Sequence, residues 1–145
     1  MKILFVCTAN ACRSQMAEAW ARHLGPASWT IASAGLLTHP VSRRADAVMR
    51  EVGLDLDGQY SKSIDDVDLD DFDLVVTLSE EAGRYLPALA RPERHWPRPM
   101  RDPMEASGAP DEVREAFRAG RDRIRDVVRE VVDTLAPDGP GGIVS

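Results

Sequence analysis

Cysteine is scarce in this chain, which contains only two in 145 residues. Cys7 and Cys12 are too few to cross-link a fold, and they do not form the paired CxxC units of a zinc site. In a reducing compartment, cysteines used so sparingly are more often chemical than structural. We therefore consider this pair first as reactive groups.

Long apolar runs and an excess of positive charge are also lacking. No segment approaches the roughly 18 apolar residues of a membrane-spanning helix, and the apolar start at 1–6 is too short for a secretory signal. We therefore expect a cytoplasmic protein with no membrane partner. The 18 Lys and Arg are outnumbered by 24 Asp and Glu, which gives a net charge of -6. Nucleic-acid affinity depends on basic surfaces, so no nucleic-acid partner is expected, although one anion can still bind locally.

The hydrophobic pattern alternates between strands and helices. Short apolar or β-branched runs predict strands at 2–6, 29–33 and 74–78. Helical spacing and capping residues predict helices at 14–24, from Ser42 to Gly53, after Ser79, and over 113–135. This order predicts an α/β fold, a small parallel sheet with helices on both faces. We expect residues 1–135 to form a single domain and residues 136–145 a flexible tail.

Several finer expectations concern individual segments. Val48, Met49 and Val52 should form the buried side of their helix, and the proline-rich segment 91–110 should be an extended surface loop. Acidic residues fill 65–73 around three apolar anchors, which indicates a solvated loop or one helical turn. The last helix should place its arginines on the solvent side; these are Arg118, Arg121, Arg125 and Arg129.

The segment from Cys7 to Ser14 carries the clearest chemical signal. It begins where the first strand ends and finishes where a helix begins, so successive backbone N–H groups and the helix N-terminus can surround a tetrahedral oxyanion. Arg13 adds a two-pronged guanidinium that matches two oxyanion oxygens. Asn10 suits a left-handed turn, and Ser14 can donate a hydrogen bond to the sulfur of Cys7. The predicted substrate-binding residues are Thr8, Ala9, Asn10, Ala11, Cys12 and Arg13.

In this position Cys7 would be a thiolate lying beneath a bound anion, ready to act as a nucleophile. The alternative, two buried structural cysteines, explains Cys7 after an apolar strand but gives no reason for Arg13.

Cys7 to Glu18 reads CTANACRSQMAE, and this segment resembles the low-molecular-weight protein tyrosine phosphatase superfamily. Within it, the segment is more similar to the arsenate reductases, because the phosphatases usually place Pro where this chain has Gln15. Further similarities cover most of residues 1–135, at Ser33-Ala34-Gly35, 73–78, His95-Trp96 and Asp102-Pro103. The resemblance implies a small four-stranded parallel sheet flanked by helices.

Residue roles follow from the same resemblance. It implies that Cys7 is the nucleophile, Arg13 binds the oxyanion, Ser14 stabilises the thiolate, and Asp102 is the general acid for the leaving oxygen. Without the resemblance, Asp102-Pro103 would be interpreted as an ordinary turn.

A departure from the family concerns the second sulfur. Thioredoxin-coupled arsenate reductases of this fold use two further cysteines, the first at the position of Ser79, and no cysteine follows Cys12 here. Two routes remain for releasing arsenite from Cys7. Cys12 can form a disulfide that thioredoxin reopens, or an external thiol such as glutathione or mycothiol attacks, with glutaredoxin or mycoredoxin completing the cycle. Cys12 can equally serve to protect Cys7 from oxidation. No tightly bound cofactor is expected.

Some relatives also hold a potassium ion beside the loop. Asn10, Glu18 and Ser33 match part of that site, but Ser63 stands where an acidic ligand is expected. Lys62 is available to replace the cation, so no bound metal is predicted.

Two other functions compete with arsenate reduction to arsenite through a covalent Cys7 adduct. One is a phosphatase that acts on phosphotyrosine or small aryl phosphates through a phosphocysteine at the same site. The residues that follow Asp102-Pro103 are not aromatic, which disfavours stacking on a phosphotyrosine ring. The other is a redox-sensing module in which the cysteine pair reports oxidation. His23, His39 and His95 lie outside the loop and are not expected to act as bases or metal ligands.

Overall fold

The computed structural model describes residues 1–136 of the chain. The last helix ends at Leu135, and Ala136, which follows it, is buried. The rest of the predicted tail, residues 137–145, lies outside the described residues.

All strand pairs of the sheet are parallel. The strands are β1 (Lys2–Cys7), β2 (Thr30–Gly35), β3 (Leu74–Thr77) and β4 (His95–Pro97), in the order β2-β1-β3-β4. Cys7 pairs with Gly35 at the end of β1, and Val6 pairs with Thr77. Because parallel strands end at one edge, Cys7 lies where ligands bind in folds of this kind. The predicted four-stranded parallel α/β architecture is confirmed.

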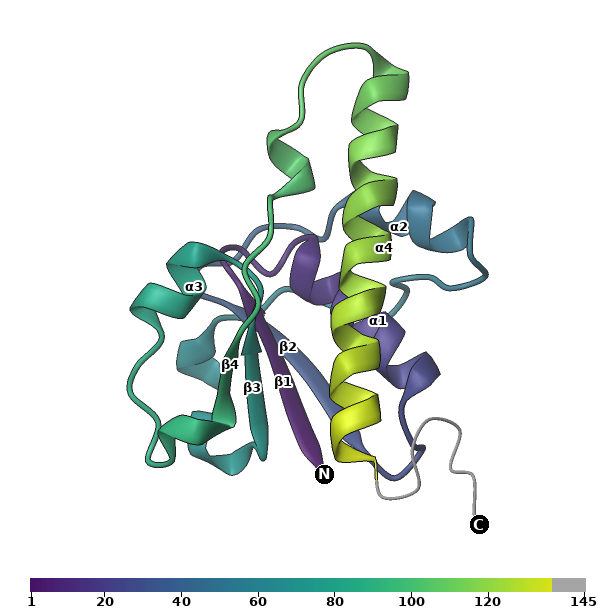
Figure 1. Ribbon diagram of the computed structural model, residues 1–145. Helices are drawn as coiled ribbons and strands as arrows, with labels where there is room; N and C mark the ends of the chain where they lie inside the picture. The colour runs from purple at the N-terminus through teal and green to yellow at the C-terminus, as the bar shows by residue number, and fades with distance from the viewer. Residues whose placement is uncertain (137–145) are drawn as a thin grey trace.

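Helices cover both faces of the sheet (Figure 1). They are α1 (Arg13–Leu24), α2 (Arg43–Arg50), α3 (Glu80–Tyr85) and α4 (Pro110–Leu135). Ser42 and Ser79 accept hydrogen bonds from the backbone N–H groups of Ala45 and Ala82, so both predicted caps are confirmed. In the described part of the chain, no helix combines the length and apolar character needed to cross a membrane.

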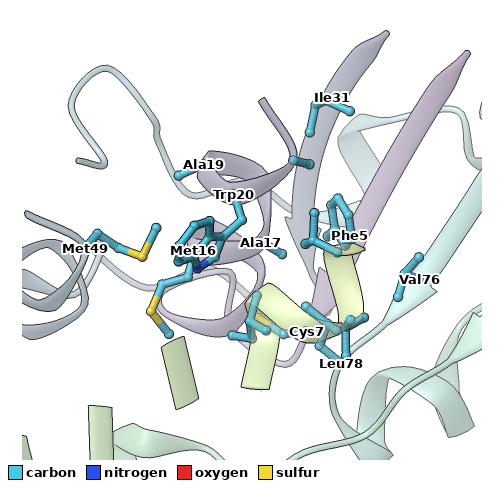
Figure 2. Packing of buried hydrophobic residues seen from close by; sticks show 14 of the residues in the cluster. Phe5, Cys7, Met16, Ala17, Ala19, Trp20, Ile31, Met49, Val76 and Leu78 are labelled. Carbon is cyan, nitrogen blue, oxygen red and sulfur yellow. The ribbon is translucent and has the colours of Figure 1, made fainter. Parts of the chain in front are cut away.

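The core divides into two layers because side chains alternate along each strand. Ile3 and Phe5 belong to the layer that packs against α1 and α4, and Figure 2 shows Phe5, Ala17 and Trp20 within this cluster. Leu4 and Val6 point to the opposite face, toward α3 and the two short 3-10 turns at Ile64–Asp66 and Leu69–Asp71. Phe72, from the acidic segment, is buried in this second layer as its anchoring role predicted.

Three expectations were wrong in detail. The segment 91–110 is not all loop, because His95–Pro97 forms β4 at the sheet edge, where Pro97 is tolerated. Helix α2 ends at Arg50, so Val52 lies in the following turn and is 40% exposed. Arg121 is only 9% exposed because it donates 2.9 Å and 2.8 Å hydrogen bonds to Val48 O and Glu51 Oε1, which tie α4 to α2.

Strand β2 also extends further than expected, through Ala34 to Gly35. Gly35 lies against the loop that follows β1, and a Cβ added there would be 2.7 Å from the backbone nitrogen of Asn10. Only glycine allows this approach without a shift of the backbone. The end of β2 therefore supports the loop after Cys7.

Candidate active site

The loop of residues 8–12 connects β1 to α1 and is held from outside by its carbonyl groups. Cys7 O, Thr8 O and Ala11 O accept backbone hydrogen bonds of 3.2, 2.9 and 2.8 Å from the segments after β2; the donors are Leu36, Leu37 and Ser42. Because these carbonyls are bonded to the surrounding segments, we expect the N–H groups of the loop to face its centre. The centre also lies at the N-terminus of α1, where the helix dipole favours negative charge.

Asn10 and Ser14 fix the hydrogen bonding of Cys7. Asn10 has the predicted left-handed backbone, with φ of 49°. Its Oδ1 accepts from the backbone N–H of Lys62, so its Nδ2 faces the hydroxyls of Ser14 at 2.7 Å and Ser33 at 3.0 Å. Because Ser14 Oγ already accepts this hydrogen bond, its own hydrogen is available for Cys7 Sγ, 2.9 Å away. Asn10 and Ser14 therefore direct a hydrogen-bond donor at the sulfur of Cys7.

The network continues from Ser33 to the side chain of Glu18. Ser33 Oγ donates to Glu18 Oε1 over 2.7 Å, and Arg22 Nη2 pairs with Glu18 Oε2 at 2.6 Å. Lys62, the predicted replacement for a cation, instead directs Nζ to Tyr60 O at 3.3 Å. Burial lowers the pKa of Lys62 below its usual range. The charge of Glu18 is therefore balanced by direct contact with Arg22. Among residues 1–136, no group of three His, Cys, Asp or Glu side chains could hold a metal ion.

Gln15 is a site residue whose role the sequence did not reveal. It is fully buried, and its Nε2 donates to Asn10 O at 2.9 Å and Tyr60 O at 3.1 Å. Gln59 donates to its Oε1 at 2.8 Å. The hydrogen bonds of Gln15 connect the first turn of α1 to the loop. A proline at this position, which is usual in the phosphatases, could make none of them.

Arg13 and Asp102 approach each other across the loop. The Arg13 side chain is nearly buried; its Nη1 donates to Met100 O at 3.0 Å and its Nη2 lies 3.4 Å from Asp102 Oδ2. Asp102 Oδ1 accepts from the backbone N–H of Met104 at 3.0 Å, which caps the short turn Pro103–Glu105. Asp102 thus serves both as a turn residue and as a carboxylate that faces Arg13.

The cavity directly above Cys7 is small. Its volume is about 10 Å³, and it is lined by Cys7, Ala9, Ala11, Cys12, Arg13, Asp102 and Met104. A volume of this size holds about one water molecule. A tetrahedral oxyanion is larger than this space, whose lining includes Asp102 and Met104 from the segment after β4. A separate cavity of about 480 Å³ lies between this segment and α4.

Cys12 lies at the start of α1 and is 2% exposed. Burial raises the pKa of its thiol well above the ordinary value, and the charges of Asp102 and Cys7 raise it further, against the opposing charge of Arg13. Cys12 is therefore a protonated thiol at neutral pH.

Ser79, at the position of the missing relay cysteine, accepts a 3.0 Å hydrogen bond from Thr8 Oγ1 and so lies beside the loop. His95 bonds to Thr77 Oγ1 at 2.8 Å, and burial lowers its pKa.

Comparison with known proteins first defines the class. The model of the family described as low molecular weight phosphotyrosine protein phosphatase matches residues 2–137, and the chain belongs to this family. The solved tyrosine phosphatase of T. tengcongensis has the same fold, with 24% identity, a TM-score of 0.78, and coverage of 93% of this chain and 99% of that chain.

Nearer relatives within this fold carry a more particular name. A protein of Halalkalibacterium halodurans named arsenate reductase is 40% identical over 139 residues, which cover 94% of this chain and 96% of that protein. The arsenate reductase of Bacillus subtilis is 38% identical over 135 residues, covering 91% and 95%. A solved arsenate reductase in a phosphate-binding state is 33% identical, with a TM-score of 0.81, and covers 93% of this chain and 98% of that chain.

Proposed function

We propose that this protein reduces arsenate to arsenite with electrons from thiols, and that Cys7 is the nucleophile. The observation that carries the proposal is the position of Cys7 Sγ, 2.9 Å from Ser14 Oγ at the centre of the loop. Relatives that match more than nine-tenths of the chain and are named arsenate reductase support the choice of arsenate.

The first step uses Cys7, Arg13 and Asp102. The Cys7 thiolate attacks arsenic and forms an S–As bond, while one arsenate oxygen leaves as water after receiving a proton from Asp102. Arg13 holds two of the remaining oxygens through its guanidinium. In the second step another thiolate attacks Cys7 Sγ, an S–S bond forms, and the S–As bond breaks. Its electron pair passes to arsenic, which falls from the +5 to the +3 state and leaves as arsenite.

We infer that the second thiol comes from outside the chain. Cys12 is the internal candidate, but burial and its raised pKa keep it protonated, and a thiol attacks far more slowly than a thiolate. An external thiol, glutathione or mycothiol in kind, would form a mixed disulfide with Cys7 that a second thiol or a glutaredoxin-type protein reduces. This cycle requires reduced cysteines and suits a reducing compartment such as the cytoplasm.

The test is arsenite formation from arsenate by the purified protein, measured in parallel with thioredoxin, with glutathione and glutaredoxin, and with mycothiol and mycoredoxin. Hydrolysis of an aryl phosphate is measured beside it, because a phosphatase would use the same loop. We expect arsenite to form with a small-thiol system and not with thioredoxin. If the protein released phosphate from the aryl phosphate but formed no arsenite with any donor, the proposal would be wrong and the protein would be a phosphatase.

Cys12→Ser separates the two sources of the second thiol. Because an external thiol needs no Cys12, we expect the variant to keep at least about half of its arsenite formation with small thiols. The measurement is the initial rate of arsenite formation with each donor. Loss of thioredoxin-driven reduction, while aryl phosphate hydrolysis persists, would make Cys12 the resolving thiol and contradict the external route.

Asp102→Asn separates an enzyme from a redox sensor. An amide cannot supply the proton, so we expect arsenate reduction to fall by about 10²-fold. Phosphate should bind more tightly, because the carboxylate that lies 3.4 Å from Arg13 in the free protein no longer competes with it. Turnover is followed by arsenite release and affinity by titration calorimetry. If the protein were a redox sensor, Cys7 and Cys12 would be oxidised at the same rate in this variant as in the wild-type protein. Neither protein would then turn over arsenate.

A further inference from the structure

A third cavity lies beside the loop that follows Cys7. Its volume is about 410 Å³, and its lining residues are Thr8, Arg13, Glu80, Glu81, Pro99, Met100, Arg101, Asp102 and Glu105. We call this cavity the mouth. Cavities of about 300 to 1,000 Å³ are typical of small-molecule sites. The mouth therefore has room for a molecule larger than an oxyanion, next to Thr8, which directly follows Cys7.

The mouth is lined by more negative than positive charge. In the mouth, the negative charge of Asp102 is paired with the positive charge of Arg13. The remaining charged side chains of the lining are Arg101, which is positive, and three carboxylates, those of Glu80, Glu81 and Glu105. Within residues 1–136, none of these three carboxylates pairs with an Arg or Lys side chain, whereas Glu18, Glu51 and Glu130 all do. A hydrogen bond from its own backbone N–H and one from Thr8 hold the pKa of Glu81 below its usual range, so it stays charged. The charges of Arg13 and Arg84 also lower the pKa of Glu81, but four carboxylates against Arg13 and Arg101 leave the lining of the mouth with a net negative charge.

We propose that the mouth binds the small-molecule thiol that supplies the second sulfur, and that Glu80, Glu81 and Glu105 favour a thiol whose remainder carries no net negative charge, as in mycothiol, over one whose remainder is net negative, as in glutathione. This inference rests on the arsenate-reductase function proposed above. The attacking sulfur has the same charge in every thiol, so selection acts on the rest of the molecule. After arsenite leaves, a second molecule of the same thiol attacks the outer sulfur of the mixed disulfide. This step releases a small disulfide and restores the Cys7 thiolate.

The experiment compares three thiols of similar size, which are 2-aminoethanethiol (positive), 2-mercaptoethanol (neutral) and 3-mercaptopropionate (negative). Arsenite formation is measured with each at low ionic strength, for the wild-type protein and for the triple variant Glu80→Gln, Glu81→Gln, Glu105→Gln. The ratio of variant to wild-type rate for each thiol cancels the intrinsic reactivity of that thiol. Glu105→Gln alone provides a second variant with a smaller change in charge.

We expect the triple variant to gain about fivefold with the negative thiol, to stay within about twofold with the neutral thiol, and to lose about fivefold with the positive thiol. The differences should shrink at about 0.5 M salt, because exposed charges are screened. The matched control is Glu93→Gln, Glu112→Gln, Glu115→Gln, which removes the same charge from exposed residues outside the mouth. It should leave all three ratios near one.

The inference would be overturned if the ratio of variant to wild-type rate were the same for all three thiols, or if the control variant showed the same trend. In either case, arsenite formation by the wild-type protein would still support the proposed function. Arsenite formation with thioredoxin but with none of the small thiols would also overturn it. No arsenite from any donor in the wild-type protein would overturn the proposed function itself, and this is seen before any variant is compared.

Discussion

Replacement of Cys7 by Ser is expected to lower arsenate turnover by at least about 10⁴-fold. The side chain keeps its shape and its place beside Ser14 Oγ, but a hydroxyl is almost never ionised at neutral pH and is a far weaker nucleophile. Serine also lacks the sulfur that must form a disulfide when arsenite leaves. The reaction therefore fails at both of its steps, and the measurement is arsenite released per enzyme with an excess of thiol.

Binding should survive the same substitution. The loop N–H groups, the N-terminus of α1 and Arg13 remain, so inorganic phosphate should bind to Cys7→Ser at least as well as to the wild-type protein. Titration calorimetry measures this affinity, and circular dichroism checks the fold. Cys12→Ser is the matched control, since it changes the other buried cysteine. Turnover by Cys7→Ser above about one per cent of wild type would mean that another group attacks arsenic.

The part of the site that lies within one short segment could be predicted from the sequence. The strand, loop and helix from β1 to α1 follow from an apolar run, a residue suited to positive φ, and helical spacing after Ser14. The structure has Asn10 at φ 49° and Ser14 Oγ 2.9 Å from Cys7 Sγ. Both features belong to one segment of eight residues, although Lys62 and Ser33 also hold the side chain of Asn10. Local sequence therefore contains the information that specifies them.

Contacts from distant segments could not be predicted in this way. Arg13 is held by the carbonyl of Met100, and Met104 closes the cavity above Cys7. A carbonyl has no side-chain signature, and Met104 lies in a proline-rich segment that local reasoning assigns to a loop. Arg121 was misplaced for a related reason. Helical spacing puts it near the edge of the apolar face of α4, and only the carbonyl of Val48 and the carboxylate of Glu51 explain its burial.

The short strand β4 illustrates the limit of pattern reasoning for the fold. Its three residues include Pro97 and show no apolar run. They form a strand because Val75 and Thr77 of β3 present an open edge that pairs with His95 and Pro97. The resemblance to a four-stranded family supplied the fourth strand that composition and periodicity did not.

The second large effect is expected for Arg13→Lys, which retains the charge but should lower kcat/KM by about 10²-fold. One guanidinium now donates to Met100 O at 3.0 Å and reaches Asp102 at 3.4 Å through different nitrogens. The single ammonium of lysine is shorter and cannot present two parallel donors to two oxyanion oxygens. Steady-state arsenite formation should show the loss in both KM and kcat, because the fork holds the anion in the ground state and while arsenic is attacked.

The matched control for this change is Arg98→Lys. Arg98 also makes a two-pronged contact, with Glu130 at 2.8 Å through Nε and Nη2, but it lies outside the loop. An exposed ion pair of this kind contributes little to stability, so activity and melting temperature should both stay near wild type. If Arg13→Lys were as active as Arg98→Lys, positive charge alone would be sufficient for oxyanion binding. The geometric fit of the guanidinium would then have no role, and the case for Cys7 would rest on the loop N–H groups and the helix terminus.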